Sequence, residues 1–192
     1  TKTIKPHWIT DIKINPFNPK NVLFVTGYGI WETYNIFEEK VKWYFNNQGI
    51  EETVPMQIIS PHRGAHLISA MGDIDGFIHK NLNKSPEKRH TPVKKTTLAI
   101  DYAGLKPEIL VKAYDSTKPY GAYSINGGEK WIDFKSFPEK TKAGGVKSIV
   151  ISADGKSIVW CTKDTDISYS KDNGNKWTKS KGNVPSGYWI VS

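Results

Sequence analysis

Short apolar segments recur along the chain in pairs, and each pair is joined by a polar turn. Within the segments the apolar residues alternate with polar ones or run together for a few positions, which is typical of β-strands and too short for helices. Four such pairs can be aligned, at residues 12–25, 57–70, 98–111 and 148–160. The pattern predicts four strand-turn-strand hairpins and an all-β fold.

A second repeated feature follows the last two hairpins. Residues 170–177 fit the pattern Ser-x-Asp-x-Gly-x-x-Trp, the Asp box, and residues 124–131 form a weaker copy with Asn126 at the third position. Asn126 and Asp172 are 46 residues apart, and further steps of about this length lead back to Asn81 and Asn35. A repeat of this length, with a strand on each side of the box, is typical of four-stranded β-propeller blades.

We therefore expect a partial β-propeller domain over residues 1–192, with about four blades of a larger ring. The expected blades are residues 7–50, 51–95, 96–140 and 141–187, followed by the start of a further strand. Four blades of a larger ring leave strand edges open, and the chain begins at Thr1 without an initiator Met. The expected chain is a fragment of a longer protein.

The Asp box itself has a structural interpretation. Its Gly permits a left-handed turn, its Asp or Asn caps that turn, and its Trp packs the turn against the blade. We expect Asp172 and Asn126 to hold turns together and to take no part in catalysis. Asp boxes occur in several unrelated enzymes and receptors, so they predict the fold much better than the reaction.

Composition narrows the class of protein. A chain of 192 residues with 38% hydrophobic and 12% aromatic residues is expected to fold. The net charge of +8 comes mostly from dispersed lysines, and with only two arginines the chain favours a solvated surface over a nucleic-acid partner. No apolar run approaches the ~18 residues of a membrane span. Cys161 is the single cysteine and is expected to be a buried strand thiol.

Three blocks of sequence resemble one known family. Residues 8–19, followed by residues 27–29, strongly resemble the start of the second propeller of family 74 glycoside hydrolases, the xyloglucanases. Residues 49–53 and 69–79 reinforce the resemblance in the family's order and approximate spacing. It continues more weakly through both Asp boxes and covers nearly the whole chain.

The resemblance implies a secreted, extracellular hydrolase that cuts the β-1,4-glucan backbone of xyloglucan with inversion. Family members use one aspartate from each of two seven-bladed propellers, without a cofactor or metal. Asp11 matches the second-propeller aspartate, whose role is general acid, and the general base would belong to a first propeller that this chain lacks. The partners implied are plant cell-wall polysaccharide and that first propeller. Asn15 departs from the Asp common in the family, which affects the turn more than the proton donor.

The residues around Asp11 are compatible with two interpretations. A general acid has to be held protonated, and desolvation by Trp8 and Ile9 is expected to favour that form. Alternatively, Asp11 is an ordinary polar residue on the solvated face of a strand, together with Lys13 and Asn15. The family resemblance favours the general acid.

Further acidic residues are candidates for substrate binding. Period-two spacing would put Asp73 and Asp75 on one strand face about 6 to 7 Å apart, near the separation of an inverting pair. Because neighbours on one strand rarely flank a scissile bond, we favour a loop-ordering or sugar-binding role for Asp73. Glu51 and Glu52 are candidates for bonding substrate hydroxyls, with an exposed charge pair as the alternative.

Aromatic residues near Asp11 in the sequence are candidate sugar platforms. Trp8, Tyr28 and Trp31 are equally compatible with stacking on sugar rings and with packing inside the blade, whereas Trp43 is expected to pack.

Other functions are less compatible with the sequence. His62 and His66 are separated by Gly64 and are not expected to bind zinc on a helix. Sialidases resemble one another in clamping substrate with three arginines, and this chain has two. The remaining alternative is a non-catalytic Asp-box propeller that binds glycan or protein, as in sortilin-like receptors or assembly factors.

Overall fold

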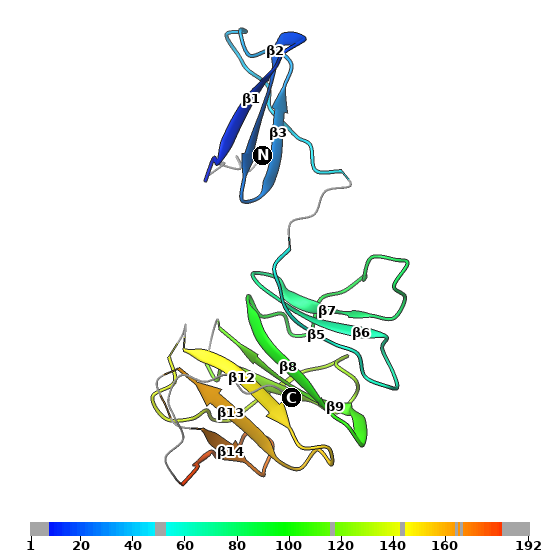
Figure 1. The fold of residues 1–192 in the computed structure, drawn as a ribbon, viewed down its shortest axis with the longest axis vertical. Coiled ribbons are helices and arrows are strands. Elements are labelled where there is room, and N and C mark those ends of the chain that lie inside the picture. The colour runs from blue at the N-terminus through cyan, green and yellow to red at the C-terminus, as the bar shows by residue number, and fades with distance from the viewer. Residues whose placement is uncertain are drawn as a thin grey trace. The chain divides into compact units, whose positions relative to one another are not determined.

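The computed structural model describes residues 8–48, 53–115, 118–142, 145–163, 165 and 167–181. These residues contain fifteen β-strands and no helix, which confirms the all-β fold (Figure 1). The strands form four antiparallel sheets in which neighbours in the chain are also neighbours in the sheet. Such consecutive meanders are the architecture of propeller blades.

The four sheets follow one another in chain order. The first sheet contains β1 (Asp11–Asn15), β2 (Asn18–Thr26), β3 (Gly29–Thr33) and β4 (Tyr44–Phe45). The second contains β5 (Pro55–Ile59), β6 (Leu67–Met71) and β7 (Asp75–His79). The third contains β8 (Thr97–Ala103), β9 (Lys106–Tyr114), β10 (Gly121–Ser124) and β11 (Ile132–Asp133). The fourth contains β12 (Val146–Ile151), β13 (Ile158–Thr162), β14 (Ser168–Ser170) and β15 (Thr178–Lys179). Blade limits within the chain stay a prediction.

The chain divides into two compact units, Thr1–Thr53 with the first sheet and Val54–Ser192 with the other three. In the second unit the first strands of successive sheets lie side by side, β5 against β8 and β8 against β12 (Figure 1). Side chains also link these strands, since Gln57 Oε1 accepts a hydrogen bond from Ile100 N at 3.0 Å. Asp101 Oδ2 accepts one from Ile151 N at 2.8 Å. The three sheets therefore pack in sequence order.

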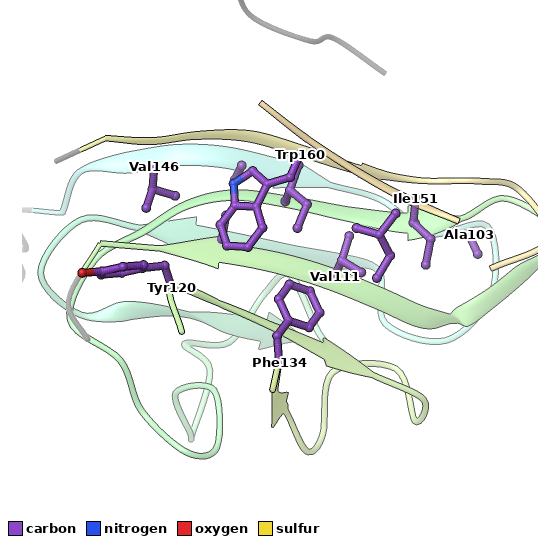
Figure 2. Packing of buried hydrophobic residues seen from close by; sticks show 11 residues of the cluster. Ala103, Val111, Tyr120, Phe134, Val146, Ile151 and Trp160 are labelled. Atoms are coloured by element: carbon purple, nitrogen blue, oxygen red, sulfur yellow. The ribbon is translucent and has the colours of Figure 1, made fainter. Parts of the chain in front are cut away.

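The third sheet is buried on both faces. Leu110 packs toward the second sheet and Val111 toward the fourth, and both are fully buried. Figure 2 shows Trp160 of β13 and Phe134, just after β11, pointing toward one another, with ring centroids 5.8 Å apart. Burial on both faces explains why apolar residues run together in Ile109–Val111 of β9 instead of alternating with polar ones.

Both Asp-box turns are closed by the same hydrogen bonds. Ser170 Oγ donates to Asp172 Oδ1 at 2.8 Å, and the backbone N of Lys176 donates to the same oxygen at 2.9 Å. In the other copy Asn126 Oδ1 accepts from Ser124 Oγ at 2.9 Å and from Lys130 N at 3.0 Å. The third residue of each box is therefore a turn cap, as its structural interpretation predicts.

The upstream echoes of the box differ from one another. Asn35 Oδ1 accepts from Thr33 Oγ1 at 2.8 Å and from Lys42 N at 3.1 Å, so a wider turn of the same kind precedes β4. Asn81 caps a local turn through Asn83 N at 2.9 Å. Among the described residues no fourth strand of the second sheet follows that turn. The repeat is thus degenerate in the second sheet.

Candidate functional site

Asp11 is the first residue of β1 and pairs with Val25 of β2. Its side chain is 58% exposed, and Oδ1 lies 3.2 Å from Lys13 Nζ. The same oxygen accepts a hydrogen bond from Ile12 N at 2.9 Å. Within the first sheet, the carboxylate of Asp11 is therefore accessible to solvent and to a ligand.

The desolvation expected from the neighbours of Asp11 is not found. Trp8 is 75% exposed, and Ile9 is also exposed. Desolvation of Asp11 would have to come from groups other than these two residues. The sequence-based expectation that Trp8 and Ile9 bury the carboxylate is wrong for this unit.

Two of the candidate aromatic residues lie at the same end of the first sheet as Asp11. Trp8 packs over Gly27, where a Cβ would lie 3.0 Å from Trp8 Cε3. Tyr28 follows in the β2–β3 turn and is 52% exposed. Asn47 Nδ2 donates to the carbonyl oxygen of Tyr28 at 3.0 Å, which holds the turn. Trp8, Tyr28 and Asp11 are thus available together to a ligand.

Trp31 lies on the other face of the sheet. It pairs with Phe24 and Phe45, whereas Asp11 pairs with Val25, so the two side chains point to opposite sides. The Trp31 ring is stacked on Phe24 at 6.1 Å and tilted against Phe45 at 4.9 Å. These contacts favour the packing alternative, and a sugar-binding role for Trp31 stays a prediction. Trp43 also packs on Phe24, at 4.7 Å.

The first sheet contains a buried carboxylate, Glu32, that was not predicted from the sequence. Glu32 Oε1 accepts from Asn21 Nδ2 at 2.9 Å, and Oε2 accepts from Asn46 Nδ2 at 2.8 Å. Hydrogen bonds from Asn21, Tyr34 and Asn46 lower the pKa of Glu32, although burial acts in the opposite direction. Asn15 Nδ2 donates to Asn21 Oδ1 at 3.0 Å, so this residue supports the hairpin, as expected from its position. An acidic residue within an apolar strand was the available signal.

Asp73 and Asp75 do not form a pair of carboxylates on one strand. Asp73 lies in the β6–β7 turn with φ +61° and is exposed, whereas Asp75 begins β7 and is fully buried. The period-two argument fails because the backbone leaves extended geometry at Asp73. A sugar-binding role for the exposed Asp73 stays a prediction.

Asp75 instead belongs to a buried ion-pair cluster, which we define as Asp75, His90, Thr97 and Lys112. Lys112 Nζ lies 2.7 and 2.9 Å from the two carboxylate oxygens. Thr97 Oγ1 donates to Oδ1 at 2.6 Å, and Lys94 N donates to Oδ2 at 2.5 Å. His90 Nδ1 is 3.3 Å from Oδ1. The ion-pair cluster thus joins the second and third sheets.

Burial and charge act against one another in the ion-pair cluster. Burial would raise the pKa of Asp75, but the hydrogen bond from His90 and the charge and hydrogen bond of Lys112 hold it well below its usual range. Burial lowers the pKa of Lys112 to about 8, although Asp75 acts in the opposite direction. Burial also lowers the pKa of His90, which keeps the imidazole neutral at pH 7. At neutral pH the cluster is a buried Asp-Lys ion pair beside a neutral His.

Glu51 and Glu52 lie outside the described residues. In the part of the chain that is described, no three His, Cys, Asp or Glu side chains gather in a way that would hold a metal ion. The same residues contain no helix of the length and hydrophobicity that crossing a membrane requires.

Comparison with solved structures gives the class of fold. The chain superposes on a GH74 xyloglucanase from Xanthomonas campestris with a TM-score of 0.70 and 35% identity, over 94% of this chain and 27% of that one. The four sheets are therefore part of a β-propeller, as the repeat predicts.

Comparison of sequences identifies the family. The chain is 33% identical over 195 residues to a xyloglucanase from Paenibacillus sp, covering 96% of this chain and 19% of the relative. It is 36% identical over 178 residues to a xyloglucanase from Acetivibrio thermocellus, covering 88% of this chain and 21% of the relative. The chain belongs to glycoside hydrolase family 74, and the resemblance found in the sequence is confirmed. A search against models of protein families gives no match.

The chain spans about a fifth of the length of these curated relatives. The names of the relatives describe whole enzymes, and the chain corresponds to one segment of such a protein.

Proposed function

We propose that this chain is a segment of the second propeller of a secreted, inverting hydrolase of xyloglucan or a related β-1,4-glucan. The observation that carries the proposal is the position of Asp11. Its carboxylate is solvent-accessible at the start of β1, at the end of the sheet that also presents Trp8 and Tyr28. An accessible carboxyl group beside exposed aromatic rings is suited to a sugar chain.

In this proposal Asp11 is the general acid that protonates the leaving glycosidic oxygen. An inverting enzyme needs a second carboxylate across the sugar, about 6.5 to 9.5 Å away, to activate water. We assign that general base to a first propeller outside this chain, so the segment alone is expected to be inactive. Trp8, Tyr28, Asp73, Glu51 and Glu52 are assigned to substrate binding, and the polysaccharide of the plant cell wall is the proposed partner.

The decisive test is the substitution Asp11→Asn in the full-length parent protein. Loss of the acid should lower kcat for the release of reducing ends from xyloglucan by about 10²- to 10⁴-fold. Asp172→Asn is the matched control, because Asn126 caps the equivalent turn of the other box with the same hydrogen bonds. This control should retain the activity of the wild type.

Two results would contradict the proposal. Hydrolysis that survives Asp11→Asn would remove the general-acid role. A full-length wild type that binds xyloglucan but hydrolyses no β-glucan would favour a non-catalytic, glycan-binding propeller.

A further inference from the structure

Lys112 occupies a position that an aromatic residue occupies in the neighbouring sheet. Lys112 of β9 pairs with Ala122, which lies two residues before the first Ser of its box. Trp160 of β13 pairs with Ser168, which lies two residues before the first Ser of the other box, so Lys112 and Trp160 are at equivalent positions. In the fourth sheet the box residue Trp177 packs on Trp160, with ring centroids 5.1 Å apart. In the third sheet Lys112 Nζ lies 4.8 Å from the ring centroid of the box residue Trp131. A buried ammonium thus replaces an aromatic ring.

The first sheet follows the aromatic pattern, since Trp43 packs on Phe24 at the equivalent position. Apolar packing at this position is therefore compatible with the fold. Replacing a buried ion pair by apolar residues of similar volume is often neutral or stabilising, because desolvation offsets much of the attraction. A gain in stability therefore does not explain why the fully buried pair of Lys112 and Asp75 is present. The connection of this pair to the turn next to Asp75 points to another role.

That turn, residues 72–74, has an unusual backbone. Asp73 within the turn and Asp75 directly after it have φ values of +61° and +74°, in the left-handed region that residues with side chains rarely adopt. Gly76 follows with φ +144°, and a Cβ there would lie 1.9 Å from the carbonyl oxygen of Ser69. Such a conformation persists only where its surroundings hold it.

The surroundings of the turn provide that restraint through the segment between the second and third sheets. Asp73 N donates to Thr96 Oγ1 at 2.9 Å, and Asp75 N donates to the carbonyl oxygen of Lys95 at 2.7 Å. The Asp75 carboxylate is in turn fixed by Lys112 and Thr97. The ion-pair cluster therefore anchors Asp75, which follows the turn directly and lies two residues from Asp73.

We propose that Asp75 and Lys112 are positioning residues that hold the 72–74 turn so that Asp73 presents its carboxylate to a sugar hydroxyl. The inference rests on the proposed function for the ligand of Asp73, whereas the restraint on the turn can be tested without any ligand. Asp73 and Tyr28 lie in equivalent turns, each between the second and third strands of its own sheet.

The test uses the 192-residue chain and the double variant Asp75→Asn/Lys112→Met, which removes both charges together. Amide hydrogen exchange of residues 72–75 is expected to rise about 10-fold or more, while exchange in β12 and β13 stays unchanged. Affinity for a xyloglucan oligosaccharide should fall by a similar factor, because the carboxylate of Asp73 is no longer held in place. Asp73→Asn should lower this affinity and leave the exchange of the turn unchanged.

A second ion pair supplies the matched control. Lys80 follows the last strand of the second sheet, and Glu129 lies in the box turn of the third; both are exposed and both lie outside the 72–74 turn. Lys80→Met/Glu129→Gln should leave both the exchange and the affinity unchanged. If the buried double variant does not fold, Thr97→Val removes a single 2.6 Å hydrogen bond to Asp75 and should raise turn exchange by a smaller factor.

Each result decides a separate point. Unchanged exchange at residues 72–75 in the double variant, or in Thr97→Val if that is the variant that folds, would overturn the positioning role. Faster exchange with undiminished affinity, in a chain where Asp73→Asn does weaken binding, would overturn the link between turn and ligand. Equal binding by wild type and Asp73→Asn would overturn the sugar-binding role of Asp73, while the exchange result would still decide the restraint.

Discussion

Asp11 and Asp75 each form an ion pair with a lysine, but in opposite surroundings. The pair of Asp11 with Lys13 is 3.2 Å long and joins two side chains that are more than half exposed on one strand. The pair of Asp75 with Lys112 is 2.7 Å long, fully buried, and joins strands of different sheets. One carboxylate is accessible to a ligand, and the other is part of the protein interior.

The difference separates two uses of the same residue type. In water an ion pair gains little, so the exposed carboxylate of Asp11 can exchange Lys13 for another partner. In the interior each charge depends on the other, so the partner of Asp75 is fixed. Accessibility, and not the presence of a charged neighbour, distinguishes the candidate catalytic residue from the structural one.

The largest expected effect is that of Lys112→Met on stability. This substitution leaves Asp75 buried without its counter-ion and should lower the free energy of unfolding of the 192-residue chain by about 3 to 5 kcal/mol. Urea denaturation followed by tryptophan fluorescence measures the change. A loss of less than about 1 kcal/mol, the range of exposed pairs, would show that the two ion pairs do not differ in the way described.

A smaller effect is expected from acid. The pKa of Asp75 lies below its usual value, so its contribution to stability is complete above about pH 3.9 and is lost as the pH falls below that value. The stability difference between wild type and Asp75→Asn should therefore shrink on acidification, by up to about 1.4 kcal/mol for each pH unit of lowered pKa. Urea unfolding at a series of pH values between 5 and 2 measures it, and a constant difference would contradict the lowered pKa.

The smallest effect is expected for Lys13→Met. Because the pair of Lys13 with Asp11 is exposed, its removal should change the free energy of unfolding by less than about 1 kcal/mol, and added salt should reduce even that change. The same denaturation experiment, at low and at high salt, checks it. A loss comparable to that of Lys112→Met would mean that Asp11 is anchored and is less available to substrate than its exposure indicates.

The sequence predicted the fold because the fold depends on repeated local rules. The spacing of Asn35, Asn126 and Asp172 marks turns that are closed by the same kinds of hydrogen bond. The regularity fails at Asn81, where the chain beyond β7 takes another course. That course brings His90 and Thr97 to Asp75, and no local pattern predicts it.

The candidate site was predicted in part. Asp11 was chosen because of the family resemblance, and Trp8 and Tyr28 were chosen because they are aromatic residues near it in the sequence; the structure places all three at one end of the first sheet, and their roles stay predictions. The opposite orientation of Trp31 follows only from the register of β1 and β2, which the sequence pattern does not specify. The environment of Asp75 was missed although Lys112, between the apolar residues Ile109–Val111 and Ala113, was a signal that a buried counter-ion was needed.

The outer strands β4, β11 and β15 are each two residues long. A sheet edge offers unpaired backbone N–H and C=O groups to any other extended chain, and a long edge invites aggregation by strand addition. These short edges present few such groups, and β15 carries Lys179 as well. The rims of these blades are therefore poor templates for intermolecular β-pairing, which favours solubility at high protein concentration.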